Sequence, residues 1–310
     1  MKERPACTRL PDGARLNLSH GPIYLILQAF GTPAAVHAAE QAAMRRFATL
    51  LDDLCAELPL LRSPACPSGQ HPQGATACRM TDAVRPFAAH GFITPMAAVA
   101  GAVADEILAA MTGAASLEKA YVNNGGDIAL HLAAGSAFTL GIVESIDSPH
   151  IAATARISAE SPIRGIATSG WAGRSFSLGI ADAVTILART AAAADAAATL
   201  VANAVDLPHP SIRRRPATDL QPDSDLGARP VTTFVGSLEQ PAIAQALRKG
   251  RQKAEQFQAE GHIIAAALFL KGHGFNTGDL ALADAPLAVL PKTSACPPAH
   301  QTMQRISVHA

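Results

Sequence analysis

The chain has 310 residues, of which 49% are hydrophobic, 16% charged and 4% aromatic. This composition is that of a globular protein with a core of ordinary size, and its packing depends on alanine and aliphatic side chains because aromatic residues are scarce. Lys plus Arg and Asp plus Glu number 25 each, so no overall positive field exists to hold a nucleic acid.

The start of the chain and its apolar runs indicate a cytoplasmic protein. Residues 1–10 are polar and lack the apolar segment of a signal peptide. The best candidate for a membrane span, Met96–Met111, is interrupted by Asp105 and Glu106, so we expect no membrane partner. The five cysteines include no C-x-x-C pair, which disfavours both a disulfide framework and a zinc knuckle.

The first predicted elements are a hairpin and two helices. Residues 15–30 alternate apolar and polar side chains around a Ser-His-Gly turn, which predicts a β-hairpin. Residues 33–61 carry apolar side chains at helical spacing. Residues 63–76 are rich in Pro, Gly and Ser and predict a loop. Thr94 and Pro95 then begin a second helix, because Thr caps helices well and Pro is tolerated at the first helical position.

The rest of the chain alternates short strands with helices. Strands are predicted over 119–122, 128–132, 137–143, 231–235 and 263–270, a strand-turn-strand unit over 163–187, helices over 190–205 and 241–260, and a polar loop over 207–230. This succession predicts an α+β (mixed α/β) fold in one domain over residues 1–286, followed by a Pro-rich tail over 287–310.

A glycine-rich turn between two of these strands suits a phosphorylated ligand. It contains Asn124, Gly125, Gly126 and Asp127. Paired glycines let the backbone adopt positive φ and approach a ligand closely, and their N–H groups can face phosphate oxygens. Asn-Gly is also the strongest hairpin signal, so a plain hairpin is the alternative.

A second polar bend follows the strand over residues 164–167. Thr168, Ser169 and Gly170 provide hydroxyl and backbone N–H groups, and the guanidinium of Arg174 lies close behind them in the sequence. Together these groups suit an anionic ligand. An ordinary β-turn is the alternative.

Asp195 and Thr199 form a third pattern, in the alanine-rich helix. Their spacing of four residues places both side chains on one helix face. A carboxylate and a hydroxyl suit Mg²⁺, which takes few protein ligands and keeps waters, whereas a solvated helix face is the alternative. Replacing Asp195 by Ala is expected to spare the fold, because Ala is the better helix former.

The order of these motifs resembles the ApbE-like flavin transferases. Asn-Asn-Gly-Gly-Asp precedes Ala-Thr-Ser-Gly and then Ala-Asp-x-x-x-Thr, and Gly101 with Asp105 is similar to a family motif ending in Gly-x-x-x-Asp. The likeness covers residues 94–205, and residues 95–101 are typical of a shorter, mostly uncharacterised branch. The resemblance implies an ApbE-like fold, Mg²⁺ bound by Asp195 and Thr199, and cleavage of FAD with transfer of FMN to a threonine of a target protein.

Two departures from the family bear on the reaction. The family's His-Ile-x-Asp-Pro segment is missing, since residues 171–180 contain no histidine, and Ala100 replaces the family lysine. The remaining catalytic candidates are His90, Asp127 and Arg174. The other histidines are scattered along the chain, and none has the spacing of a metal site.

Three functions fit these patterns. The first is an ApbE-type enzyme that acts on a flavin nucleotide, and the second is another enzyme on the same fold, such as a hydrolase of a small-molecule pathway. The third is a non-catalytic flavin or nucleotide-binding protein. We expect the two turns and the Asp195–Thr199 face to line one cavity. We also expect a homodimer, because the helix from Pro95 to Met111 presents small residues and surface charge is scarce.

Overall fold

The computed structural model describes residues 4–143, 151–278, 281–282 and 306–309. Its centre is a nine-stranded sheet in the order β1-β2-β3-β4-β5-β8-β9-β12-β13, and every neighbouring pair is antiparallel. The strands are β1 (Ala6–Arg9), β2 (Leu16–His20), β3 (Ile23–Phe30), β4 (Lys119–Asn124), β5 (Asp127–Leu132), β8 (Gly165–Ser169), β9 (Ala183–Ala188), β12 (Ala265–Leu270) and β13 (His273–Thr277).

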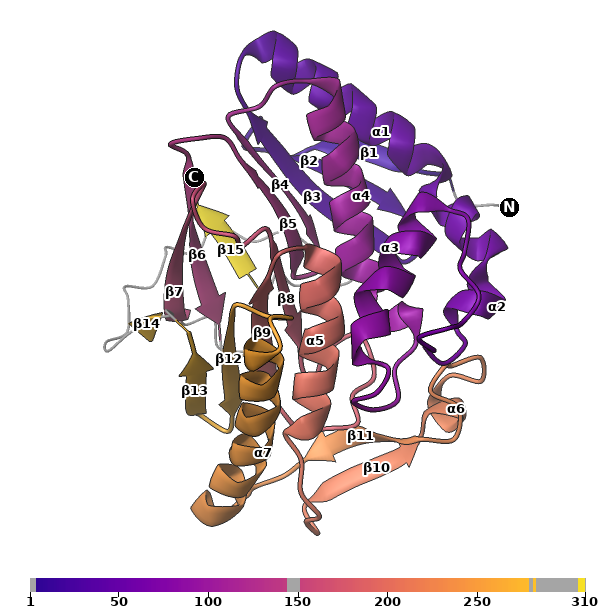
Figure 1. The fold of residues 1–310 in the computed structure, drawn as a ribbon, viewed down its shortest axis with the longest axis vertical. Coiled ribbons are helices and arrows are strands. Elements are labelled where there is room, and N and C mark those ends of the chain that lie inside the picture. Colours follow the sequence, from indigo (N-terminus) through magenta and orange to yellow (C-terminus); the bar gives the residue numbers. More distant parts are fainter. Residues whose placement is uncertain (1–3, 144–150, 279–280, 283–305, 310) are drawn as a thin grey trace.

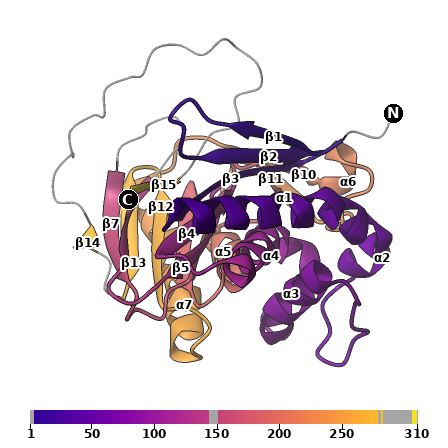
Figure 2. The same ribbon diagram turned by 90° about the horizontal axis from the view of Figure 1, so that it is seen from above.

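Helices cover one face of this sheet (Figures 1 and 2). They are α1 (Pro33–Ala56), α2 (Leu58–Leu61), α3 (Ala75–Val84), the short helices η1 (Arg85–Phe87) and η2 (Pro95–Ala98), α4 (Val99–Ala114), α5 (Ala191–Ala204) and α7 (Gln240–Ala259). The buried side of α5 is mostly alanine, so its backbone packs close to the neighbouring strands and to α4. This layer contains the larger of two hydrophobic cores.

A second core lies on the opposite face of the sheet. There β6 (Ala137–Val143) and β7 (Ile151–Ser158) form a small sheet with β14 (Ala281–Leu282) and β15 (Ile306–His309). Phe138, Leu140 and Ile142 of β6 pack against side chains of the large sheet such as Ile128 and Phe269. Strands β9 and β12 are buried at every residue, because successive side chains point alternately into the two cores.

The α+β class is confirmed, and so are most of the predicted elements. Thr190 caps α5 as expected, since its Oγ1 accepts a hydrogen bond of 3.2 Å from the N–H of Ala193. The prediction of a continuous loop over 207–230 is wrong, because β10 (Ile212–Pro216), α6 (Ala217–Leu220) and the start of β11 (Pro230–Val235) lie there. The ribbon of β10 and β11 carries arginines on β10, so its sequence lacks the apolar periodicity from which a strand is predicted. The predicted domain boundary at residue 286 lies outside the described residues.

The central helix α4 is apolar for most of its length. Among the described residues, the segment Pro95–Ala114 is the one helix long and apolar enough to cross a membrane by length and composition alone. In the structure it packs against α1, α5, β4 and β5, with Gly101, Ala102 and Ala104 buried inside the chain. Core packing therefore accounts for its composition. The small-residue face no longer argues for a homodimer, which stays a prediction.

Candidate functional site

The N-terminal ends of α4 and α5 meet at the middle of the helical layer. Figure 1 shows the two helices one above the other, in front of the large sheet. Gly101 makes the contact possible, because a Cβ there would lie 2.2 Å from the carbonyl oxygen of Ala191. Both helix dipoles therefore direct their positive ends toward one small region.

Each of these helices carries the aspartate that caps the other. Asp195 of α5 accepts a hydrogen bond of 3.1 Å from the N–H of Gly101 in the first turn of α4. Asp105 of α4 accepts hydrogen bonds from the N–H groups of Ala191 (3.1 Å) and Ala192 (2.9 Å) in the first turn of α5. The two carboxylates thus satisfy backbone donors that a helix start leaves unpaired. Asp195 therefore also has a structural role as a cap of α4. Asp195→Ala removes that cap, an effect that the comparison of helix propensities leaves out.

The Asn-Asn-Gly-Gly-Asp segment is a two-residue hairpin that contacts the start of α4. Gly125 and Gly126 connect β4 and β5 with φ values of +65° and +112°, which glycine adopts readily. Asn124 Nδ2 donates a hydrogen bond of 3.1 Å to the carbonyl oxygen of Ala100. The hairpin interpretation of this turn is therefore correct, and its tip also lies beside the helix ends.

The guanidinium of Arg174 lies directly against this tip. A Cβ on Gly125 would be 2.0 Å from Arg174 Nη2, so a side chain there would displace the guanidinium, while the positive φ favours glycine. Arg174 is exposed, and among the described residues it forms no ion pair. A free cation thus stands next to a glycine turn, as the sequence predicts for an anion-binding group.

Strand β8 contributes Thr168 to the same region. Its N–H donates a hydrogen bond of 3.2 Å to Asp127 Oδ1, and its hydroxyl pairs with that of Thr185 at 2.9 Å. Thr168 and Ser169 are the last residues of β8, so their assignment to a turn is wrong. The chain leaves the strand at Gly170, where a Cβ would be 2.3 Å from the carbonyl oxygen of Asp182.

Three acidic side chains influence one another at the helix ends. Burial, followed by the charge of Asp127, raises the pKa of Asp195 well above its ordinary value, and the charge of Asp105 acts in the same direction. Burial also raises the pKa of Asp105 to about 6, although the N–H groups of Ala192 and Ala191 oppose the shift. Like charges that share poorly solvated surroundings disfavour ionisation unless a cation joins them.

The oxygen donors of this group fit a hard cation. Asp127 and Asp195 offer carboxylates whose charges act on each other, and Thr199 lies one helical turn beyond Asp195. Thr199 is partly buried, and its hydroxyl has no hydrogen-bond partner within the part of the chain that the structure describes. Carboxylate and hydroxyl oxygens are the ligands that Mg²⁺ accepts.

His90 does not join this group. The recorded contacts of its side chain are with Gln256, Phe257 and Glu260 at the C-terminal end of α7. The preference for His90 as a catalyst beside the glycine turn therefore finds no support in its contacts. The sequence-based choice depended on the proximity of His90 to α4 along the chain, whereas the packing of α7 determines where its side chain lies.

Comparisons with known proteins agree with the motifs. A family model described as AbpE bacteria matches residues 7–280. A UPF0280 protein of Methanopyrus kandleri is 35% identical over 186 residues, which cover 58% of this chain and 71% of that protein. A UPF0280 protein of Methanoregula boonei is 36% identical over 183 residues, covering 56% of this chain and 71% of the relative.

One solved structure with a distant likeness is the ApbE protein of Thermotoga maritima. It is 11% identical, has a TM-score of 0.40, and the match covers 91% of this chain and 97% of that chain. The family model spans most of the sequence and includes the glycine turn, Thr168 and the whole of α5. The chain therefore belongs to the AbpE bacteria family, the ApbE-like branch that the order of its motifs predicts.

Proposed function

We propose that this protein binds FAD, FMN or a related phosphorylated small molecule together with Mg²⁺, at the residues around Asp127 and Asp195. The proposal is supported by the position of Asp195 at the N-terminus of α4, where it accepts a hydrogen bond from Gly101, and by the charge of Asp127, which raises the pKa of Asp195. Two negative charges in poorly solvated surroundings call for a proton or a cation. A cation held there would in turn attract a diphosphate.

In this proposal Asp195 and Thr199 hold Mg²⁺, with Asp127 next to them. Two or three protein ligands make a weak site by themselves, so a diphosphate completes it. Bound Mg²⁺ would neutralise part of the negative charge of the phosphates. The guanidinium of Arg174 and the N–H group of Gly125 would contact the remaining phosphate oxygens, whereas the N–H of Gly126 already donates to Asn123 Oδ1 at 2.9 Å.

The activity that we propose first is that of an ApbE-type enzyme acting on FAD in the cytoplasm. One observation supports an alternative function, namely the absence of histidine from residues 171–180. Without that family segment, the same site would serve a hydrolase of a small-molecule pathway or a flavin-binding protein without catalysis. Incubation of the protein with FAD and Mg²⁺ distinguishes these alternatives, since release of AMP requires cleavage and binding alone does not.

Calorimetric titration of FAD, with and without Mg²⁺, tests the binding site. The informative variant is Asp195→Asn, because the amide oxygen can still accept the hydrogen bond from Gly101 while the charge and the anionic ligand are lost. Wild type is expected to bind FAD more tightly with Mg²⁺, by about tenfold or more, and Asp195→Asn is expected to lose that gain.

The matched control is Asp105→Asn, which removes a neighbouring charge but no proposed ligand. It should keep the gain in affinity from Mg²⁺, since Asp105 faces the backbone of α5. Equal FAD affinity in wild type with and without Mg²⁺ would contradict the proposal. Equal losses in both variants would mean that general negative charge, and not ligation by Asp195, attracts the ion.

A further inference from the structure

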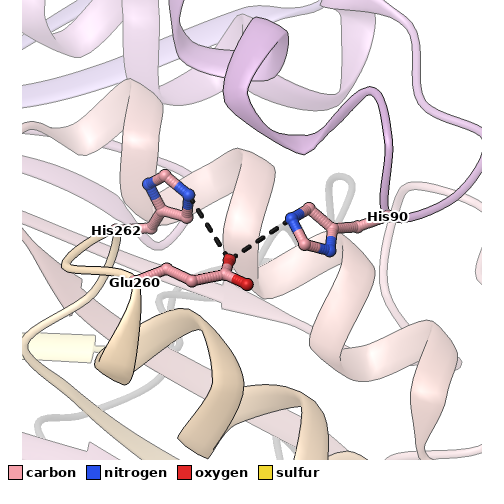
Figure 3. A group of neighbouring side chains, drawn as sticks. All are labelled: His90, Glu260 and His262. Atoms are coloured by element: carbon pink, nitrogen blue, oxygen red, sulfur yellow. Dashed lines mark ion pairs between the residues drawn. The ribbon is translucent and has the colours of Figure 1, made fainter.

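Two histidines and a glutamate from distant parts of the chain meet at the C-terminal end of α7. His90 follows η1, whereas Glu260 and His262 follow α7. Their ligand atoms all lie within 4.8 Å of one another. Figure 3 shows both imidazole rings directed at the same carboxylate. The expectation that the histidines form no metal site considered spacing along the chain only, and the fold brings residues 90 and 262 together.

The backbone fixes two of these three residues. Gly261 has a φ of +77° and ends α7 in a Schellman motif. In this motif the N–H of His262 donates to the carbonyl oxygen of Phe257 at 2.9 Å, and the N–H of Gly261 donates to that of Gln258 at 3.0 Å. Glu260 and His262 therefore project from a turn whose geometry does not depend on their side chains.

Aromatic packing orients the imidazole rings. Phe87 and Phe257 lie 4.7 Å apart between ring centroids, and His262 meets Phe87 edge-on at 5.0 Å. The ring of His90 meets Phe257 edge-on at 5.2 Å. Gln256 Nε2, an amide donor, lies 3.3 Å from His90 Nδ1, and Nε2 of the same ring faces Glu260. Ligation of a metal by Nε2 would therefore move the proton of the ring to Nδ1 and turn the Gln256 amide.

Two of the three distances between the ligand atoms match those of a tetrahedral site. Glu260 Oε2 lies 3.2 Å from His90 Nε2 and 3.5 Å from His262 Nε2. Ligands bound to Zn²⁺ at about 2.0–2.1 Å in tetrahedral geometry are separated from one another by about 3.3 Å. The two imidazole nitrogens lie within 4.8 Å of each other and would close around the ion by rotation of the side chains.

We propose that His90, Glu260 and His262 bind Zn²⁺, with water at the fourth position. Imidazole nitrogens together with one carboxylate suit Zn²⁺ and not Mg²⁺, which takes oxygen ligands. A cation here also offsets an electrostatic mismatch, because Glu260 lies at the C-terminal end of α7, where the helix dipole is negative. The ion would clamp the segment before α4 to the end of α7.

This site is independent of the proposed flavin site. Its donors are mainly nitrogens, and its three residues are not among the groups that shift the pKa of Asp195. Titration of the full chain with ZnCl₂ after chelator treatment tests it directly. One equivalent is expected to bind, and the thermal midpoint of unfolding is expected to rise with Zn²⁺ concentration.

His262→Asn and Glu260→Gln should each weaken Zn²⁺ binding by about 10–100-fold or more. His209→Asn is the matched control, because His209 also faces a glutamate, with Nε2 3.1 Å from Glu239 Oε2, but it belongs to no three-residue group among the described residues. It should bind Zn²⁺ as wild type does. A Co²⁺-loaded wild type should show the visible absorption of a four-coordinate ion, and the His262 variant should not.

Two results would overturn the assignment. The first is a wild type that binds no Zn²⁺ at micromolar concentration. The second is unchanged affinity in both variants together with a loss in Cys78→Ser, because Cys78 Sγ lies 3.6 Å from His71 Nδ1 and that pair is the competing place for a soft ion. Neither result bears on FAD binding, which is measured with Mg²⁺ and with other variants.

Discussion

At the scale of single residues, Asp105 and Asp195 each combine a capping role with a charge that the surroundings disfavour. A carboxylate at a helix start is stabilised by hydrogen bonds from backbone N–H groups and by the helix dipole. Burial opposes ionisation, and for Asp105 burial dominates, since its pKa rises to about 6. These side chains therefore fix the geometry of the helix ends at the expense of stability at neutral pH.

The pH dependence of stability tests this balance. A carboxyl whose folded pKa exceeds its unfolded value binds its proton more tightly in the folded state, so its contribution to stability is complete at low pH and is lost as pH rises through the folded pKa. Asp105→Asn removes the charge and keeps one of the two acceptor oxygens, so the loss of the second hydrogen bond lowers stability equally at every pH and leaves the pH-dependent difference to report the charge. The variant should therefore gain about 1–2 kcal/mol relative to wild type between about pH 4.5 and pH 7.5. Urea denaturation at both pH values measures this, and parallel curves for the two proteins would contradict it.

At the scale of elements, the crossing of α4 and α5 determines where the candidate site lies. The contact needs a residue without a side chain at position 101, and the alanines of α5 keep the two helices close. The capping aspartates then set the register of one helix against the other. The tip of the β4–β5 hairpin is tied to the same point through Asn124 and Ala100.

Two glycines of α4 separate the effect of close packing from that of helix propensity. At Gly101 an added Cβ meets backbone at 2.2 Å, whereas at the exposed Gly113 it meets nothing within 4 Å. Gly101→Ala should cost about 1–3 kcal/mol or more through overpacking, and Gly113→Ala should stabilise by about 0.5–1 kcal/mol. Chemical denaturation gives both values. Stabilisation by both substitutions would show that the helices have room to separate.

At the scale of the whole molecule, the large sheet carries a separate core on each face. The smaller core depends on a few aromatic side chains, among them Phe138, which is 1% exposed and lies 6.2 Å from the ring of Phe30 and 6.0 Å from that of Tyr121. This is the side of the sheet away from the helices (Figure 1). The small sheet is therefore held mainly by aromatic and aliphatic burial.

Truncation of Phe138 measures that contribution. Phe138→Ala should destabilise the protein by about 3–5 kcal/mol, because a large buried ring is replaced by a cavity. Phe234, which is 47% exposed on β11, is the control, and Phe234→Ala should change stability by less than about 1 kcal/mol. Similar changes in the two variants would show that the small sheet adds little to the folding free energy.

Local patterns in the sequence were sufficient for the hairpin at residues 15–30, the cap at Thr190 and the glycine turn at 125–126. Each depends on neighbouring residues and on general backbone preferences. Thr94 stands at the start of η2 as predicted, but its hydroxyl donates to Asp225 and does not cap the helix. The β10–β11 ribbon could not be predicted in this way, because exposed arginines hide its strand periodicity.

Contacts between distant residues were beyond those patterns. Asp195 was recognised from its spacing to Thr199, but its bond to Gly101 follows only from the packing of α5 on α4. In the same way, Glu260 and His262 stand two residues apart in the sequence, while His90 reaches them because η1 and α7 share the Phe87–Phe257 contact. Tertiary packing, and not local preference, decides both groups.

The exchange of caps between α4 and α5 has a consequence for the order of folding during translation. The bonded residues are 94 and 86 positions apart, so the first turn of α4 has no acceptor for Gly101 until residue 195 has left the ribosome. The β2–β3 hairpin and α1 contact one another within residues 16–56 and can begin to assemble early, although α1 also packs on α4 and β3 also pairs with β4. Because long-range contacts form slowly, the two central helices mature as a pair after most of the chain has been synthesised, and the region around Asp127 acquires its final geometry only then.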